Sequence, residues 1–427
     1  MLRRTLFLLT IICMAVVAGY GTAVADDSPV TAAEANGHKP VTMELITLVA
    51  NNPEVGVLLE KSIAEAKKVN PDPKTNPVQS LSDYYYFVDR SSELLPQDML
   101  TTPSTMPMRD RMLQGICYFY FLIDQPLPEL EGMGLFKNSL QYYEPFASWA
   151  RDFAVTQGQY LDTEASWNED VYKAIYNDPE FGLQTDWYES PSNWNTFNRF
   201  FARYLASPDK RPVDYPNDPS VVVAPADSVP QGIWPIDENS RIVVDGGLKV
   251  KLGTYYSVVD LLGSESEYKD AFAGGVLTHT FLNVNDYHRY HFGVGGVIKE
   301  KMSITRNVTL EVTWDGEEKK YDPIDSTGWQ FYQTRGYVIV DTGEFGMVAL
   351  IPMGMAQVSS VNFEDNVKVG ATRMKGDMLG NFFFGGSDFI MLFQKDAGFA
   401  ITAPMESKTE YKHILTGKEY GRMTSVE

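Results

Sequence analysis

Two histidines spaced three residues apart are the first candidates for chemistry. His288 and His291 lie in Asp286–His291, which reads DYHRYH. Imidazole is the usual acid or base near neutral pH, and this spacing places both rings on one face of a helix or turn. Two other interpretations stay open. The histidines could pack among aromatic residues of a β-rich domain, or they could form a zinc pair, although no cysteine cluster supports a metal site.

A serine that follows two glycines is the second candidate. Ser387 comes directly after Gly385 and Gly386 in the stretch FFFGGSDF. Two glycines permit a tight, strained turn with an exposed hydroxyl, and they leave the Gly386 carbonyl carbon open to attack by that hydroxyl. An ordinary β-turn is the competing interpretation. The G-x-S-x-G spacing of hydrolases is absent, as are the glycine patterns of Walker and dinucleotide-binding loops.

An aspartate after an apolar run is the third candidate. Asp227 follows Val221–Val223 in the stretch VVVAPADS. A carboxylate in a loop after a strand can orient a histidine, as the acid of a catalytic triad does. A capping or turn aspartate is the alternative.

The elements that must position these groups are helical in the first half of the chain. Pro53–Val69 carries apolar residues at helical spacing, with proline in the first turn. Further helical stretches are expected near 109–124, 137–156 and 194–206, and no alternation of period two interrupts them. The sequence therefore predicts a mainly helical N-terminal domain over residues 46–206.

The residue pattern changes from helical to β-strand spacing after a proline-rich segment. Residues 207–220 contain four prolines and predict a linker. Short β-branched or alternating runs then predict strands at 221–223, 242–244, 249–252, 309–313, 337–340, 347–352 and 389–393. Asp315-Gly316 and residues 341–344 are hairpin signals. The expected fold class is α+β, with the helical domain followed by a β-rich catalytic domain over 221–427.

The N-terminus has the features of a secretory signal. Two arginines precede an apolar run, Leu6–Val17, and Ala23–Ala25 supplies the small-x-small cleavage pattern. The run is short for a membrane span, so an uncleaved anchor is the less favoured alternative. The sequence predicts a signal peptide over 1–25, a disordered lead-in over 26–45 and an exported protein, periplasmic or secreted.

The charge balance excludes one class of partner. Lys and Arg number 36 and Asp and Glu 56, a formal charge of −20, which becomes −22 without the two signal arginines. A nucleic-acid binder shows a basic footprint instead. The acid excess also argues against simple electrostatic docking on an anionic membrane. A hydrophobic content of 44% excludes global disorder.

Five segments, in order along residues 195–395, resemble the phosphatidylserine decarboxylase family of pyruvoyl-dependent enzymes. They are Phe197–Arg203 (FNRFFAR) with Arg211-Pro212 after it, Val223–Asp227 (VAPAD), Lys251–Ser257 (KLGTYYS), Asp286–His291 (DYHRYH) and Lys375–Ser387, which contains the glycine-serine bond. Residues 45–200 are similar to a helical N-terminal domain found in a subset of the family. That subset includes fungal decarboxylases of free aromatic amino acids.

The resemblance implies that the chain is a zymogen that cuts itself between Gly386 and Ser387. Ser387 would attack the Gly386 carbonyl, with His291 as the base and Asp227 orienting it. The resulting ester would eliminate to dehydroalanine, which hydrolyses to a pyruvoyl group and ammonia. The precursor would then consist of a large subunit ending at Gly386 and a 41-residue subunit, 387–427.

The same resemblance implies the cofactor and the reaction. The pyruvoyl group derived from Ser387 would form a Schiff base with the substrate amine and accept the electrons released as CO₂ departs. His288 is the candidate acid that returns a proton to the α-carbon. The substrate would be a small molecule or lipid with a primary amine and a carboxylate. No metal is implied, and the family implies a homodimer.

Three departures and three functional alternatives accompany the resemblance. Asp388 stands where the family usually has Thr, Ser228 where it has Gly, and Phe292 where Pro is common; none removes a reacting group. The family default is phosphatidylserine decarboxylation in phospholipid biosynthesis. The acidic, exported chain and its helical domain favour instead a free, for example aromatic, L-amino acid. The third alternative is a non-catalytic binding relative that is never cleaved.

Overall fold

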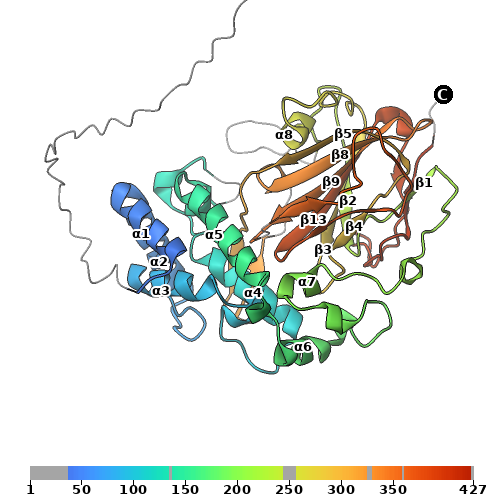
Figure 1. Ribbon diagram of the computed structural model, residues 1–427. Helices are drawn as coiled ribbons and strands as arrows, with labels where there is room; N and C mark the ends of the chain where they lie inside the picture. Colours follow the sequence, from blue (N-terminus) through green and yellow to red (C-terminus); the bar gives the residue numbers. More distant parts are fainter. Residues whose placement is uncertain (1–36, 134–136, 244–255, 325–328, 358–359, 425–427) are drawn as a thin grey trace, which may run out of the picture. The chain divides into compact units, whose positions relative to one another are not determined.

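The computed structural model describes residues 37–133, 137–243, 256–324, 329–357 and 360–424 (Figure 1). The predicted signal peptide and the strand predicted at 249–252 lie outside these residues. Within the compact unit His38–Glu427, helices occupy the first half of the chain and strands the second. The predicted α+β class is confirmed.

The helices follow the apolar periodicity of the sequence closely in two cases. The α-helices of the described residues are α1 (Pro40–Asn51), α2 (Pro53–Val69), α3 (Leu81–Ser91), α4 (Met108–Phe121), α5 (Phe146–Leu161), α6 (Glu169–Tyr176), α7 (Phe197–Phe201) and α8 (Val258–Leu262). Helix α2 has the predicted bounds, and α4 begins one residue before its predicted start. Helix α5 begins later than expected, after Pro145, and α7 is a short part of the stretch predicted at 194–206.

Helix α1 corrects the predicted lead-in. Residues 40–45, expected to be disordered, form the first half of α1. Pro40 suits a first helical turn, and Val41, Leu45 and Ile46 are buried, with α1 in contact with α2, α3 and α5. The polar and Ala-rich composition of residues 26–45 predicts disorder, although the apolar residues at its end form one face of this helix.

The strands of the described residues form four sheets in which every paired neighbour is antiparallel. The largest has the order β11-β5-β8-β9-β13-β3-β2, and the others are β10-β12-β4, β1-β15-β14 and β6-β7. The bounds are β1 (Val221–Val223), β2 (Val229–Pro235), β3 (Val276–Leu282), β4 (Arg289–His291), β5 (Gly296–Ile304), β6 (Val312–Asp315), β7 (Lys320–Pro323), β8 (Thr334–Asp341), β9 (Met347–Met355), β10 (Val361–Phe363), β11 (Thr372–Arg373), β12 (Met378–Phe382), β13 (Gly386–Phe393), β14 (Ala400–Ile401) and β15 (Glu419–Arg422).

Both predicted hairpins are confirmed. The turn after Asp315 joins β6 to β7. Asp341 ends β8, and residues 342–344 lie in the turn that leads to β9. The strand expected at 309–313 begins late, at Val312. At the run predicted over 242–244, Ile242 forms an isolated bridge with Ile236.

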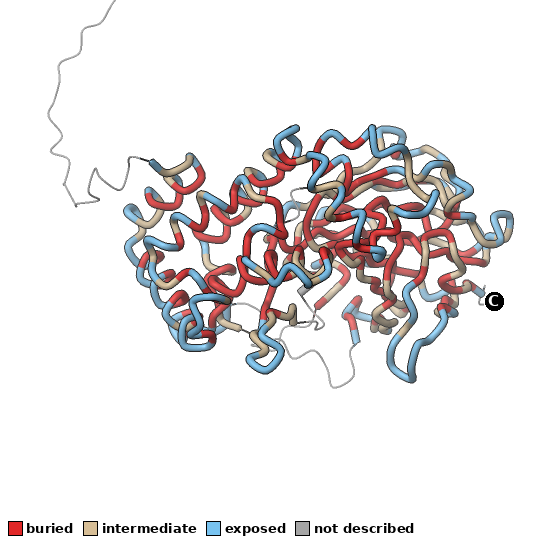
Figure 2. Tube along the Cα trace, turned by 90° about the horizontal axis from the view of Figure 1, so that it is seen from below, coloured by how far each residue is buried: buried red, intermediate tan, exposed pale blue. Residues whose placement is uncertain are grey.

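The seven-stranded sheet has a different core on each face. Ile390 and Leu392 of β13 belong to the apolar cluster that includes the helices, whereas Phe389 and Met391 belong to a second cluster with β1, β4 and β12. Successive residues of a strand point to opposite faces, which explains this division. Buried segments run through the helical and the β-rich regions alike (Figure 2).

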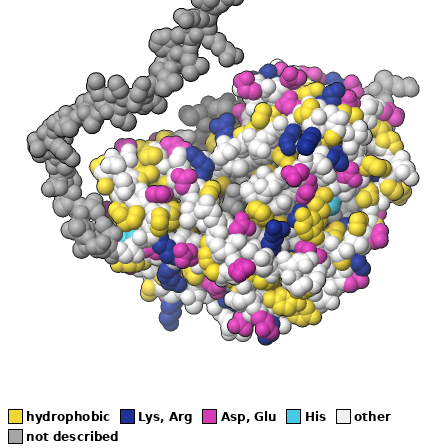
Figure 3. All heavy atoms as spheres, in the orientation of Figure 1, with side chains coloured by type: hydrophobic (Ala, Val, Ile, Leu, Met, Phe, Trp, Pro, Cys, Tyr) yellow, Lys and Arg dark blue, Asp and Glu magenta, His cyan; other side chains and the backbone are white. Residues whose placement is uncertain are grey.

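Two surface properties bear on partners. On the face shown in Figure 3, acidic and basic side chains lie interspersed among apolar ones. In the part of the chain that the structure describes, no helix combines the length and the apolar character needed to cross a bilayer.

A buried carboxylate links the helical region to the β-rich region. Asp124, just after α4, accepts hydrogen bonds from Gln141 Nε2 at 2.5 Å and from the Val312 backbone N–H at 2.8 Å, and Lys137 Nζ lies 3.1 Å away. Burial raises the pKa of Asp124 to about 7, although the Lys137 charge opposes that rise.

The raised pKa of Asp124 predicts a pH-dependent stability. The folded state favours the protonated carboxyl, so this contribution is complete below about pH 4 and is lost as the pH rises through about 7. Relative to Asp124→Asn, the parent chain should lose about 2 to 3 kcal/mol of unfolding free energy between pH 5 and pH 8. Urea titrations in a Ser387→Ala background, which keeps both proteins in one piece, measure this. Parallel pH profiles would contradict the prediction.

Candidate active site

The Gly386–Ser387 bond begins a strand inside the seven-stranded sheet. Strand β13 pairs with β9 on one side and β3 on the other, so that Ser387 lies opposite Gly354 and Leu282. The predicted exposed hydroxyl is wrong, because the Ser387 side chain is fully buried. Its Oγ has no hydrogen-bond partner among the described residues. A buried, unpaired hydroxyl is costly, and Ser387 Oγ shares this property with several other side-chain atoms of the described residues.

The two glycines before the serine are required by the local geometry. Gly385 has a φ of 145°, which side chains rarely adopt. A Cβ on Gly386 would lie 2.5 Å from Met355 Cγ. The bend predicted at the serine lies one step earlier, at 384–385, and Ser387 itself is extended.

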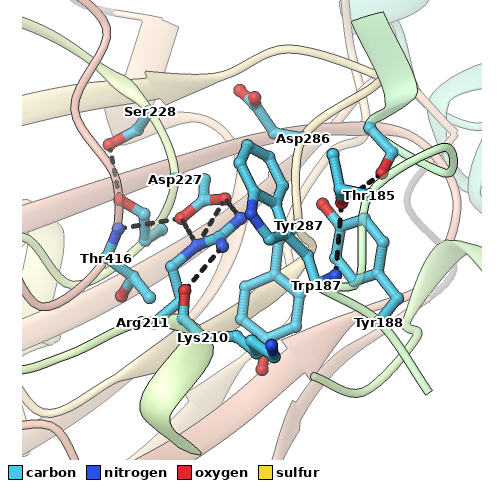
Figure 4. Close-up of polar contacts among 12 residues, drawn as sticks. Thr185, Trp187, Tyr188, Lys210, Arg211, Asp227, Ser228, Asp286, Tyr287 and Thr416 are labelled. Atoms are coloured by element: carbon cyan, nitrogen blue, oxygen red, sulfur yellow. Dashed lines mark hydrogen bonds and ion pairs between the residues drawn. The ribbon is translucent and has the colours of Figure 1, made fainter. Parts of the chain in front are cut away.

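Asp227 is held by an arginine. Arg211 Nε lies 3.0 and 3.1 Å from the two Asp227 oxygens and Nη2 lies 2.6 Å from Oδ2, while the Thr416 backbone N–H donates to Oδ1 at 2.8 Å (Figure 4). Only 4% of Arg211 and 2% of Asp227 is exposed. The Trp187 and Tyr287 rings lie 4.5 and 6.0 Å from the guanidinium carbon. The segment 207–220 therefore supplies a buried, bidentate partner to the candidate carboxylate.

His291 lies beside this pair but is bonded to other groups. Its Nδ1 is 2.8 Å from the Gly376 carbonyl oxygen and its Nε2 is 3.2 Å from the Tyr287 hydroxyl. Asp227 does not accept a hydrogen bond from His291; its oxygens accept from Arg211 and from the Thr416 backbone N–H. Burial lowers the pKa of His291, and the Gly376 carbonyl and the Asp227 charge offset this only in part. A neutral imidazole is thus favoured, the form that can act as a base.

His288 occupies a separate environment. His288 lies just before β4 and His291 is the last residue of that strand, so the helix or turn predicted from their spacing is not formed. The His288 ring stacks on Phe201 with centroids 3.8 Å apart, and its Nδ1 is 3.0 Å from the Asp286 carbonyl oxygen. Its Nε2 is buried and has no partner within the described ranges.

The electrostatics of His288 define its proton state. Burial and the positive charge of Arg203 lower its pKa to about 3. Because Nδ1 faces a carbonyl, it carries the proton and Nε2 is left as an acceptor. In the uncleaved chain this ring is therefore a neutral acceptor, and it must first take up a proton before it can return one.

Helix α7 fixes the chain that leads into the glycine-serine bond. The Phe384 ring contacts Phe201 and Phe197 edge-on, with centroids 5.2 and 5.5 Å apart. The Phe384 backbone N–H donates to Asn198 Oδ1 at 3.3 Å. His288, Phe201 and Phe384 therefore form one aromatic cluster next to the predicted cleavage segment.

The unusual Asp388 has its own partner. It lies on the opposite face of β13 from Ser387, and its carboxylate is bonded to the imidazole of His279 on β3. Both side chains are buried. Asp388 therefore pairs with His279 on the face of the sheet opposite to the Ser387 hydroxyl.

The residues present fit a group derived from Ser387 itself. The hydroxyl is unpaired, the preceding residue has no side chain, and burial lowers the pKa of both His288 and His291. Within the described ranges, no group of three His, Cys, Asp or Glu side chains is placed to hold a metal ion.

Known proteins match the same part of the chain. A sequence model described as phosphatidylserine decarboxylase matches residues 197–421. Phosphatidylserine decarboxylase proenzyme 2 of Oryza sativa is 32% identical over 48% of this chain and 30% of its own length. The decarboxylase iboD of Amanita muscaria is 29% identical over 59% of this chain and 74% of its own, and the Clostridium novyi phosphatidylserine decarboxylase proenzyme is 30% identical over 57% and 75%. The chain spans less than a third of the rice protein it matches.

Arg211 and its neighbour Lys210 give a matched test of the buried pair. Arg211→Gln leaves Asp227 as a buried carboxylate without its cation, which should cost about 3 to 5 kcal/mol of unfolding free energy. Lys210→Gln breaks only the exposed pair with Asp186 and should leave stability nearly unchanged. Urea titration of both variants in the Ser387→Ala background measures the difference. Equal stability of the two variants would contradict the importance of the Arg211–Asp227 pair.

Proposed function

The chain belongs to the phosphatidylserine decarboxylase family, and we propose on that basis that it is a proenzyme which cuts itself between Gly386 and Ser387 and then acts as a decarboxylase, a carboxy-lyase. The observation that carries the proposal is the buried, unpaired Ser387 hydroxyl that follows two glycines inside the matched region. A structural serine in a strand would normally have a partner.

Self-cleavage needs one bond formed and one broken. Ser387 Oγ bonds to the Gly386 carbonyl carbon, and the peptide C–N bond breaks to leave an ester and a free amine. His291 is the proposed base that takes the hydroxyl proton, because its lowered pKa keeps it neutral. The Asp227 charge supports proton uptake by raising the pKa of this ring, and Arg211 holds that carboxylate in place.

Elimination and hydrolysis then convert Ser387 into a pyruvoyl group. Its ketone supplies an electron sink that condenses with a substrate amine and stabilises the electrons released with CO₂. We assign His288 Nε2 to proton handling at the substrate α-carbon, because this atom is buried, unpaired and oriented by the Phe201 stack. The buried setting excludes water, which would otherwise compete for the transferred proton.

The substrate by family default is phosphatidylserine, converted to phosphatidylethanolamine. A free, for example aromatic, L-amino acid is the second candidate. It is supported by the polar cleft described below and by the match to a protein named only as a decarboxylase, which covers 59% of the chain. The signal pattern of residues 1–25 supports export of the precursor, and the family resemblance supports a homodimer of the processed chains.

Four variants separate the steps of the proposed mechanism. Ser387→Ala should abolish splitting of the chain, and Asp227→Asn or His291→Ala should slow it severely, because each removes the nucleophile, the supporting charge or the base. His288→Ala should split normally and release no CO₂. Denaturing electrophoresis over time, together with a CO₂ assay on the split protein, measures both steps.

His38→Ala is the matched control, since His38 pairs with Asp89 in the helical region and should affect neither step. Full turnover by His288→Ala would show that the assignment of the α-carbon proton to this ring is wrong. Normal splitting by His291→Ala would show that the assignment of His291 as the base is wrong.

Release of CO₂ from phosphatidylserine liposomes, compared with a panel of free L-amino acids, tests the substrate. Turnover of liposomes alone supports the family default, and turnover of free amino acids alone supports the second candidate. A split chain that releases CO₂ from neither would contradict the proposed decarboxylase. An unsplit chain would point to the non-catalytic binding relative.

A further inference from the structure

A polar cleft lies where the helical region meets β10 and β12. Its volume is about 670 Å³. Asp162, Asn198 and Arg199 line it from the helical region, and Asp365 and Asn381 line it from the β-rich region. A cavity of this size is large enough to enclose a small organic molecule.

The charges of the cleft are available to a ligand. Arg199 is exposed, and within the described ranges its guanidinium makes no hydrogen bond or ion pair; the same holds for the carboxylates of Asp162 and Asp365. Asn381 Nδ2 is buried and lacks an acceptor there. A free cation, two free anions and an unpaired amide donor in one cleft match a molecule that carries both an ammonium and a carboxylate.

The lining disfavours a lipid. Its apolar members are Ala202, Phe363 and Phe383, and the remaining lining side chains carry charged, amide or hydroxyl groups. The acyl chains of a phospholipid would need a contiguous apolar surface, which this lining does not offer. The lining therefore disfavours a lipid whose acyl chains enter the cleft, and its charges match the ammonium and carboxylate of an amino acid.

The cleft is adjacent to the segment that self-cleavage would release. Phe383 lines it, and Asn198, at its helical wall, accepts the hydrogen bond from the Phe384 backbone N–H. After cleavage, residues 383–386 would become the C-terminal end of the large subunit, no longer bonded to Ser387. Chain ends are less constrained than internal segments, so cleavage would loosen the segment that contributes Phe383 to the cleft.

One wall of the cleft comes from outside the family match. Asp162, Glu189, Asn193 and Asn195 all precede residue 197, where that match begins. The appended helical region thus adds polar groups beside the shared catalytic scaffold, which is where a substrate preference different from that of the lipid enzymes can arise.

We propose that this cleft is the binding site for a free α-amino acid, with Arg199 recognising the carboxylate and the acidic rim at Asp162 and Asp365 recognising the ammonium before the amine reacts. This inference rests on the proposed function and deepens it by naming the substrate class. Arg199 is a specificity residue in this scheme, and self-cleavage does not depend on it.

Binding to the uncleaved full chain tests the site apart from catalysis. In Ser387→Ala protein, calorimetric titration with L-serine, L-glutamate and L-phenylalanine should detect binding of at least one probe. Adding Arg199→Gln should weaken that binding about tenfold or more, since a charge-assisted hydrogen bond is lost. Arg199→Lys should restore part of it. Lys67→Gln, a charge-matched change on α2, should have no effect.

The same variants in the cleavable chain give a second measurement. Arg199→Gln should raise KM for the amino acid by a similar factor, with kcat and splitting unchanged. The proposal is overturned if no probe binds, if Arg199→Gln binds as tightly as its parent, or if phosphatidylserine vesicles bind through Arg199 while every free amino acid fails. Failure of the chain to split would contradict the proposed function. The titrations of the uncleaved chain would still test whether the cleft binds an amino acid.

Discussion

The register of β13 between β9 and β3 is the constraint on which the candidate site depends. Pairing on both edges fixes every residue of the strand, so Ser387 points to the side of β1, β4 and β12, and Asp388 points to the helical side. A shift of one residue would exchange these two side chains. The Ser387 hydroxyl would then face the helices. The Asp388 carboxylate would face the cluster that contains Phe389 and would lose its contact with His279.

Three buried carboxylates have a basic partner close by. Arg211 neutralises Asp227, His279 meets Asp388, and Asp124 is joined to Lys137 near the helical region. Each pair connects segments far apart in the sequence or in different elements, and removal of one partner leaves a charge that the interior solvates poorly. Ser387 Oγ and His288 Nε2 are among the buried polar atoms of the described residues that have no hydrogen-bond partner.

Local sequence patterns predict many of the helices and strands, whereas contacts between distant residues determine the geometry of the candidate site. Helix α2 and strand β1 follow from periodicity and β-branching, which neighbouring residues determine. The spacing of the histidines predicts one face of a helix or turn, because spacing alone does not distinguish these from the end of a strand that pairs with β12. The partners of Asp227 and Asp388 could not be read from the sequence, since Arg211 was visible only as part of a motif and His279 lies 109 residues from Asp388. The cleft likewise depends on how the helical region packs against β10 and β12.

The intact mass of the purified full-length protein under denaturing conditions tests self-cleavage most directly. The predicted result is two species, of which the smaller is the 41-residue segment 387–427 with a pyruvoyl group in place of its first residue. That group is a ketone, so phenylhydrazine should add to the small species and not to the large one. A single chain in which Gly386 remains bonded to Ser387 would contradict the pyruvoyl mechanism.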